Sequence, residues 1–499
     1  MRGQRTVRPA AATQRSFMPP QRSLSTTPNV ISVDDPYTGE VYTEVPLLTD
    51  SEADAAVDRA HEAQRAWALT DLDTRIKACD AFIDALHADA DRIAMDITCQ
   101  MGKPLANARG EIGGAEERAR GMMAAAPGAL ADEILPGKDG FFRKIVREPR
   151  GVIFVIAPWN YPLLTSVNTV VPAVLAGNSV LIKQSSRTPL CADHFADAFA
   201  AVARAVPGVP EYLVQSVPSS HATAARVVAR AEVGFVAFTG SVGGGRAVYR
   251  NVAEGPGFID ATLELGGKDP AYVAPDADLD AAAETLVDGA FFNAGQSCCG
   301  IERIYVHEDV YDGFLDRALP LVQGYALGDP KDASTTMGPL AQDEGAFLAG
   351  QVADAAAKGA RVLCGGAPTH DAAGKGRFFD PALVADCDHS MELMQEESFG
   401  PVVGVQKVSG SGGDAEAVAL MNDSPYGLTA SVFTRDEDRA AWMASRVETG
   451  TFFLNRCDYL DPELPWTGVK DTGKGVSLSK HGFDGVTRKK GWHFRLPEE

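Results

Sequence analysis

A run of 32 residues without a formal charge, from Gly151 to Ile182, constrains the fold of this chain more than any other feature. It is longer than the ~20 apolar residues that span a bilayer, yet it contains three prolines and several Asn and Thr residues. Proline removes a backbone hydrogen bond and polar side chains have no partners in lipid, so a membrane span is excluded. We expect instead a buried strand at 152–156, a helix at about 163–176 and a second strand at 179–183.

The same alternation continues after this run. Apolar runs and helical stretches follow one another, which predicts a helix at about 190–204, a strand at 212–217, a helix at 222–230 and a strand at 233–238. Strands of this kind, joined by helices, are typical of a parallel sheet.

Two long helices are predicted before this sheet. The first begins after Thr49-Asp50-Ser51, and the second begins near Asp73 and runs toward Met101. Both should cover the sheet.

A second α/β pattern begins after residue 265. We expect its strands at 303–306, 361–364, 402–406, 430–433 and 452–454. The last segment, 491–496, alternates Trp492 and Phe494 with polar residues, as a half-buried strand does, and such a terminal strand needs a partner strand. The chain of 499 residues therefore has room for more than one domain.

Composition excludes several classes of function. The chain has 46 Lys and Arg residues against 67 Asp and Glu residues, a net charge of −21, which repels nucleic acids and anionic membranes. None of the eight cysteines forms a CxxC pair, so no metal site is expected and the thiols should be free. We expect neither a nucleic-acid partner nor a membrane span.

The first 33 residues differ from the rest of the chain. They carry five arginines and no Asp or Glu, and no long apolar secretory core interrupts them. This composition predicts an organelle transit peptide and a mitochondrial matrix location. A disordered basic leader on a cytoplasmic protein is the alternative.

The segment FFNAGQSCCG at 291–300 places two thiols, Cys298 and Cys299, after a turn of Asn, Gly and Gln. A reactive thiol and an inert buried thiol are both compatible with this segment alone. The segment APWNYP at 157–162 holds Asn160 between two prolines, where a fixed amide can serve an oxyanion hole or a simple turn.

Glu264 ends the strand in ELGGK, at 264–268, where two glycines let the backbone pass close to other groups. It is a candidate general base, a ribose-binding acid or an ordinary solvated glutamate. The dinucleotide motif GxGxxG is absent, but FTGSVGGGR at 238–246 allows a tight turn whose amides can face a phosphate.

Together these segments resemble the aldehyde dehydrogenase superfamily, in family order and from about Asp34 to the C-terminus. PWNYP, a strand ending in Lys183, FTGS, ELGGK, NAGQSC, EESFGPV and a Gly-rich end all match. The resemblance implies an α/β fold with a Rossmann-like NAD(P)-binding domain at 34–136 and 154–265 and an α/β catalytic domain at 266–470. A β oligomerisation arm at 137–153 and 476–499 would build a homodimer or homotetramer.

The resemblance also implies the chemistry and its residues. Cys298 matches the nucleophile that forms a thioester, Glu264 the base that activates the hydrolytic water, and Asn160 the side chain that binds the oxyanion. Residues that match cofactor contacts are Trp159, Lys183, Ser186, Gly240, Ser241, Gly245, Glu397 and Phe399. A non-catalytic structural or binding protein of the same fold is the alternative from another class, although such proteins tend to lose the nucleophile or the base.

Two positions depart from the family pattern. Thr169 stands where much of the family has a lysine that is thought to relay protons from the base, so the proton route is open. Ser186 stands where many NAD-preferring members have a glutamate that repels the 2′-phosphate of NADP. We therefore expect both NAD and NADP to be used.

The expected substrate class rests on Phe292, six residues before the nucleophile, where succinate-semialdehyde dehydrogenases often have an arginine. Phe292, with Tyr161 and Trp466, predicts an apolar channel for medium-chain aliphatic or aromatic aldehydes. Arg456 would contradict this interpretation if it reached the channel, because its cation could pair with the distal carboxylate of succinate semialdehyde. Succinate-semialdehyde oxidation is the alternative activity.

Overall fold

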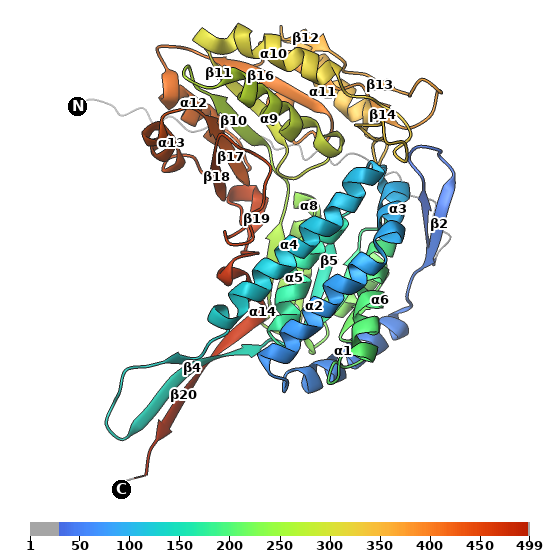
Figure 1. Ribbon diagram of the computed structural model, residues 1–499, viewed down its shortest axis with the longest axis vertical. Helices are drawn as coiled ribbons and strands as arrows, with labels where there is room; N and C mark the ends of the chain where they lie inside the picture. The colour runs from blue at the N-terminus through green and yellow to red at the C-terminus, as the bar shows by residue number, and fades with distance from the viewer. Residues whose placement is uncertain (1–28, 498–499) are drawn as a thin grey trace, which may run out of the picture.

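The structure is a computed structural model that describes residues 29–497. Most of the predicted leader, residues 1–28, lies outside the described part, and strand β1 (Val30–Asp34) already begins within the predicted leader segment. The described residues form two α/β halves and a projecting pair of strands (Figure 1). Among them no helix is both apolar and long enough to cross a bilayer.

The first sheet is parallel except at one edge, and the uncharged run lies at its centre. In spatial order its strands are β19 (Gly473–Lys474), β9 (Asp260–Glu264), β8 (Val233–Thr239), β5 (Val152–Ala157), β6 (Ser179–Gln184) and β7 (Val214–Ser216). The crossover helices are α5 (Pro162–Leu175), α6 (Leu190–Ala205), α7 (His221–Val228) and α8 (Val242–Glu254). These elements confirm the strand and helix pattern predicted for 152–238.

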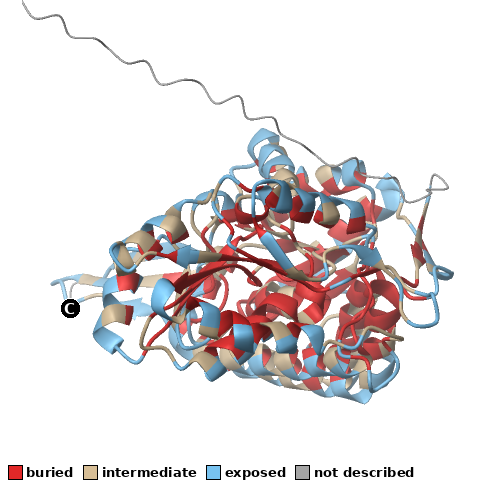
Figure 2. Cartoon of the chain, turned by 90° about the horizontal axis from the view of Figure 1, so that it is seen from above, coloured by how far each residue is buried: buried red, intermediate tan, exposed pale blue. Residues whose placement is uncertain are grey.

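Four helices precede this sheet. They are α1 (Asp50–Trp67), α2 (Leu72–Ala88), α3 (Ala90–Met101) and α4 (Leu105–Ala129). The single helix predicted from Asp73 to Met101 is wrong, because the backbone of Asp89 leaves the helical region and separates α2 from α3. Figure 2 shows that the sheets are buried between helices whose outer faces are exposed.

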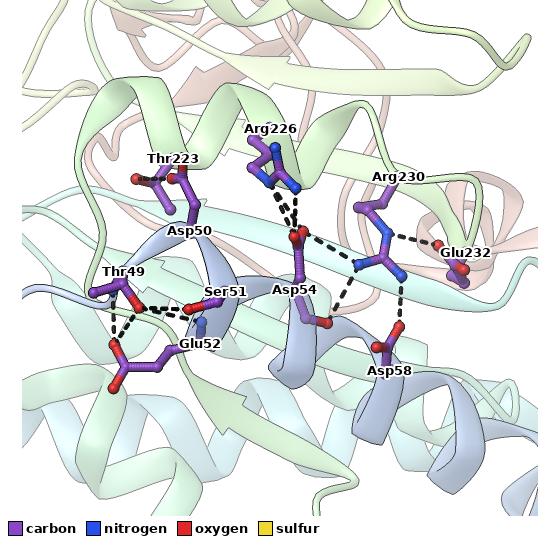
Figure 3. Close-up of polar contacts among 10 residues, drawn as sticks. All are labelled: Thr49, Asp50, Ser51, Glu52, Asp54, Asp58, Thr223, Arg226, Arg230 and Glu232. Atoms are coloured by element: carbon purple, nitrogen blue, oxygen red, sulfur yellow. Dashed lines mark hydrogen bonds and ion pairs between the residues drawn. The ribbon is translucent and has the colours of Figure 1, made fainter.

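Helix α1 begins where the sequence predicts, because Thr49 and Glu52 form a reciprocal capping box. Figure 3 shows how α1 is tied to α7 and the residues after it, where the Asp54 carboxylate accepts hydrogen bonds from Arg226 and forms an ion pair with Arg230. Exposed ion pairs of this kind contribute only about 0–1 kcal/mol each. They fix the orientation of α1 more than they stabilise the chain.

The second sheet has seven strands in the described part of the chain. In spatial order they are β12 (Arg361–Cys364), β15 (Ala382–Ala385), β16 (Val402–Val408), β11 (Ile301–His307), β10 (Asp269–Val273), β17 (Thr429–Phe433) and β18 (Thr451–Leu454). All five predicted strands are confirmed, and β10 and β15 were not predicted. Helix α9 (Leu279–Phe291) packs on this sheet and leads into the segment with the two thiols.

The terminal strand finds its partner within the chain. Strand β20 (Thr487–Arg495) pairs antiparallel with β4 (Phe141–Pro149), which also pairs with β3 (Glu133–Ile134). Figure 1 shows β4 and β20 extending away from both sheets. Phe142 and Phe494 are exposed on this arm. The predicted domain boundaries and the predicted homodimer or homotetramer stay predictions.

Candidate active site

The carboxyl ends of four adjacent parallel strands carry predicted site residues. Glu264 ends β9, Ser241 follows β8, Asn160 follows β5 and Lys183 lies near the end of β6. Ligands of open α/β sheets bind at this edge, because the strand ends and helix N-termini meet there. The order of the strands therefore brings together residues that lie 23 or more positions apart in the sequence.

Two further predicted residues lie at the amino ends of adjacent strands of the second sheet, where Cys298 precedes β11 and Glu397 precedes β16. Gly267 of the ELGGK segment precedes β10, the next strand of this sheet. Two hydrogen bonds show how closely these segments meet. Asn160 Nδ2 donates to Gln296 O at 3.2 Å, and the Gly267 amide donates to Glu397 Oε1 at 2.8 Å. The candidate site therefore lies where the edges of the two sheets face each other.

A left-handed turn presents Cys298. Asn293 and Ala294, with φ of 55° and 56°, and Gly295, with φ of 68°, follow one another in the left-handed region. This conformation costs roughly 1–2 kcal/mol for each residue other than glycine. A Cβ on Gly295 would lie 2.2 Å from Gly400 O, so the turn requires glycine there. The strain is retained at the segment that carries the thiol, as is common at functional sites.

The two glycines of ELGGK leave space for two other segments of the site, which carry Glu397 and Cys298. A Cβ on Gly266 would lie 2.4 Å from Glu397 Oε2, and a Cβ on Gly267 would lie 2.2 Å from Cys298 O. A side chain at Gly267 would meet fixed backbone, and one at Gly266 would displace the Glu397 carboxylate. The segment after Glu264 thus allows the carboxylate of Glu397 and the backbone of Cys298 to approach it together.

A buried ion pair, which the sequence analysis missed, positions Asn160. Lys103 Nζ lies 2.6 Å from Glu111 Oε2 and donates to Asn160 O at 2.9 Å. Glu111 Oε1 accepts from the amide of Leu163 at the start of α5. No periodicity marks Lys103 or Glu111, since both act through residues more than 50 positions away. They hold the loop that carries the oxyanion-binding amide.

Glu264 is surrounded by groups that set its charge. Ser477 Oγ donates a hydrogen bond to Glu264 Oε1, and Thr239 Oγ1 lies 3.4 Å from Oε2. Burial raises the pKa of Glu264, while the hydroxyl of Ser477 and the guanidinium of Arg118 oppose the increase. A carboxyl group with a raised pKa is suited to accept a proton near neutral pH.

The two adjacent thiols differ in their surroundings. Cys298 is half-buried, whereas Cys299 is buried and donates to Asp458 Oδ1 at 2.9 Å. Contact with Cys298 and burial raise the pKa of Cys299 well above its ordinary value. Burial raises the pKa of Asp458 to about 6. Of these two thiols, Cys298 is the one that is partly exposed and has no carboxylate partner in the described residues.

The residues that match cofactor contacts surround the ends of β6 and β8. Lys183 is buried, and no hydrogen bond or ion pair holds its ammonium within residues 29–497, while Ser186 nearby is exposed. Gly240 and Ser241 form the whole turn between β8 and α8. A Cβ on Gly245 would lie 2.5 Å from Leu265 Cδ2, so the first turn of α8 packs closely on the ELGGK strand.

A second buried ion pair holds the segment with Glu397 and Phe399. Lys268 Nζ lies 2.6 Å from Glu302 Oε2, and Glu302 Oε1 accepts from the Phe399 amide at 2.9 Å. The Phe399 ring contacts the Trp159 ring edge-on, with centroids 5.5 Å apart. Burial raises the pKa of Glu397 to about 8. Lys268 and Glu302 were missed by the sequence analysis.

The predicted substrate-channel residues have different environments. Phe292 is half-buried, Trp466 is only 4% exposed, and the Tyr161 ring lies 4.1 Å from Lys103 Nζ. Arg456 is exposed and stacks over the Tyr459 ring at 3.6 Å. Their roles in a substrate channel stay predictions.

Arg118 of α4 is a further site residue that the sequence analysis missed. Its guanidinium donates to Leu164 O at 2.9 Å and to Asn168 Oδ1 at 3.4 Å, and its charge opposes the increase in the pKa of Glu264. Burial lowers its pKa, although an arginine stays charged in proteins. No cluster of three or more metal-ligating side chains exists in residues 29–497.

Two characterised proteins are similar to this chain over most of its length. Succinate-semialdehyde dehydrogenase (NADP+) 1 of Mycobacterium tuberculosis is 37% identical over 456 residues, which cover 91% of this chain and 97% of that protein. The 3,6-anhydro-alpha-L-galactose dehydrogenase of Streptomyces coelicolor is 35% identical over 488 residues, 95% of each chain.

These comparisons correct the predicted location. The relatives are bacterial, and bacteria have no mitochondria, so the predicted mitochondrial location is wrong. The prediction used only the arginine-rich, acid-free composition of residues 1–33, which a basic tail shares with a transit peptide. Residues 1–28, which carry these arginines, lie outside the described part of the chain.

Solved structures and a family profile complete the comparison. The crystal structure of succinate-semialdehyde dehydrogenase from Burkholderia pseudomallei is 31% identical, with a TM-score of 0.88 and coverage of 94% of this chain and 95% of that one. The profile described as "Aldehyde dehydrogenase family" matches residues 24–491. This confirms the predicted fold and the predicted class of enzyme, an oxidoreductase that oxidises aldehydes with NAD(P)+. The chain belongs to the aldehyde dehydrogenase family.

Proposed function

We propose that this enzyme oxidises an aldehyde that carries a distal carboxylate, of the succinate-semialdehyde class, and that it accepts NADP+. The observation that carries the substrate class is the guanidinium of Arg118, which donates to Asn168 Oδ1 on the helix that follows Asn160 and whose charge opposes the increase in the pKa of Glu264. A carboxylate that enters a low-dielectric site needs a charged partner close by. The names of the relatives from M. tuberculosis and B. pseudomallei also support this class.

This proposal replaces the apolar substrate that Phe292 suggested. The sequence analysis looked for a cation six residues before Cys298, whereas Arg118 comes from a helix that lies far from Cys298 in the sequence. Arg456 is exposed and engaged with the Tyr459 ring, whereas the charge of Arg118 affects the pKa of Glu264. Phe292 then contributes an apolar wall along the substrate's methylene groups.

The chemistry follows from the geometry of the three catalytic residues. The thiolate of Cys298 attacks the aldehyde carbon, and Asn160 Nδ2, held beside Gln296, donates to the oxyanion. NAD(P)+ bound at the ends of β6 and β8 would supply the acceptor for the hydride that leaves this carbon. Glu264 then takes a proton from the water that attacks the thioester, and the carboxylic acid leaves.

The residues at the ends of β6 and β8 fit a dinucleotide. Lys183 presents an ammonium without a partner among the described residues, and the amides at the start of α8 face the same edge of the sheet. A helix N-terminus favours a phosphate, because its first amides are unpaired and its dipole is positive there. Glu397 and Phe399 would contact the nicotinamide end from the second sheet.

Cofactor choice gives the first prediction. Ser186 is exposed and carries no charge, so a 2′-phosphate meets no repulsion there. Two like charges about 4 Å apart repel by about 1–4 kcal/mol, which corresponds to roughly five- to several-hundredfold in binding. We therefore expect the wild-type enzyme to use both NAD+ and NADP+, and Ser186→Glu to shift kcat/KM toward NAD+ by a factor in this range.

The measurement is kcat/KM for each cofactor at saturating aldehyde. Ser186→Gln is the matched control, since it adds a similar volume without the charge and should change the ratio much less than Ser186→Glu. An identical NAD+ to NADP+ ratio in wild type and Ser186→Glu would refute the assignment of this position.

The substrate class gives the second prediction. Arg118→Met should lower kcat/KM for succinate semialdehyde relative to butanal, an aldehyde of the same chain length without the carboxylate. A hydrogen bond to a charged group contributes about 1.5–3 kcal/mol, so the ratio should fall roughly 10- to 150-fold. Because Arg118 also acts on Glu264, only the ratio of the two substrates isolates carboxylate binding.

Arg118→Lys is the control that keeps the charge, and it should preserve part of the preference. A wild-type enzyme that prefers butanal or benzaldehyde over succinate semialdehyde would support the apolar channel at Phe292 and overturn the proposed substrate class. If Arg456→Ala loses the preference for succinate semialdehyde while Arg118→Met keeps it, Arg456 is the residue that binds the carboxylate.

A further inference from the structure

A small cavity lies behind the candidate base. Its volume is about 10 Å³, close to the space that a single water molecule requires. The side chains of Asn168, Thr169, Thr262 and Ser477 line it, and each carries a hydroxyl or an amide. A buried water needs two to four polar partners, which these four side chains can provide.

Ser477 connects this cavity with Glu264. Its hydroxyl donates to Glu264 Oε1, and the same side chain lines the cavity. The backbone of Ser477 is fixed by two hydrogen bonds with Trp466, one from each amide, at 2.9 and 2.8 Å. The hydroxyl therefore lies in a fixed position between the carboxylate and the space for a water.

We propose that the Ser477 hydroxyl and a water in this cavity carry the proton away from Glu264 during hydrolysis of the thioester. The inference rests on the proposed role of Glu264 as the base. The oxygen of the attacking water forms a bond with the thioester carbon while its proton moves to Glu264. Protonated Glu264 then donates to Ser477 Oγ, the proton of Ser477 moves to the cavity water, and the carboxylate is restored.

The other groups that face Glu264 do not offer this route. Arg118 keeps all its protons, so it cannot accept another. Thr239 Oγ1 lies 3.4 Å from Glu264 Oε2 and does not line the cavity. Thr169 lines the same cavity, makes no hydrogen bond with Glu264 and is partly exposed, so the cavity has an exit toward solvent beside it.

The test separates the two half-reactions in Ser477→Ala. We expect a first-turnover burst of reduced cofactor with wild-type amplitude. The steady-state rate that follows should be about one-tenth of the wild-type rate or lower. Imidazole in the buffer, a small proton carrier, should restore most of the steady-state rate. Thr169→Val, which removes a hydroxyl from the cavity without touching Glu264, should give a smaller fall that imidazole also relieves.

Two matched variants serve as controls. Ser477→Thr keeps the hydroxyl and should retain the wild-type steady-state rate better than Ser477→Ala. Thr239→Val removes the other hydroxyl near Glu264, and any fall in that variant should not respond to imidazole.

An unchanged steady-state rate in Ser477→Ala would overturn the route, and so would a fall that imidazole does not relieve, since Ser477 would then only hold Glu264 in place. Glu264→Gln distinguishes this failure from failure of the base itself. If Glu264→Gln stalls after the burst while Ser477→Ala does not, only the exit route is wrong. If Glu264→Gln turns over normally, the proposed base is wrong.

Discussion

The Cys298→Ala variant is expected to form no reduced cofactor, whereas Cys299→Ala is expected to remain active. Hydride leaves the aldehyde carbon only after a nucleophile has added to it, so loss of the reacting sulfur removes the first half-reaction as well as the second. The measurement is the absorbance of reduced cofactor, both in the first turnover and in the steady state. We expect a loss of at least about a thousandfold for Cys298→Ala.

The environment of the two thiols explains why they should behave differently. The thiolate is the nucleophile, and burial with a carboxylate partner keeps the Cys299 thiol protonated by raising its pKa. Cys298 is partly exposed and follows the strained turn directly. Because Cys299 donates to Asp458, Cys299→Ser, which keeps a donor, is the better control for packing. An inactive Cys299→Ala with an active Cys298→Ala would show that the nucleophile is misassigned by one residue.

The sequence predicted the strands that are continuously apolar. Strands β5, β6 and β8 are buried on both faces, so their residues carry a clear signal. Strand β10 was missed, because Asp269 and Pro270 at its start resemble a turn. The break between α2 and α3 was also missed, since apolar residues continue at helical spacing on both sides of Asp89.

The sequence motifs predicted those candidate site residues that lie within a short, distinctive segment of the chain. Cys298, Glu264 and Asn160 each lie in a short segment with its own glycines or prolines, and the structure brings these segments to one place. Lys103 and Arg118 gave no such signal. Each acts through side chains or carbonyl groups about 50 residues away, and such contacts become visible only when α4 and α5, with the loops that precede them, are packed together.

Glu264→Gln is expected to show a full first-turnover burst and then to stall. Glutamine keeps the shape of the side chain and can still hydrogen bond with Ser477, but it cannot take a proton from the hydrolytic water. Loss of a positioned base typically lowers a rate by about 10²- to 10⁴-fold, and only the thioester hydrolysis needs this base. The burst amplitude and the steady-state rate, measured on one sample, therefore report the two steps separately.

The pH dependence provides an independent check on Glu264. Burial raises its pKa, and hydrolysis requires the ionised form, so the wild-type steady-state rate should rise with pH through this raised pKa. The residual rate of Glu264→Gln should lack that rise, because no group at this position titrates. The burst does not need the base, so a limb that Glu264→Gln removes from the pH profile of the steady state but not from that of the burst assigns the raised pKa to the hydrolytic base. A limb that persists unchanged in Glu264→Gln would assign it to another carboxyl group of the site, either Asp458, with a pKa of about 6, or Glu397, with a pKa of about 8.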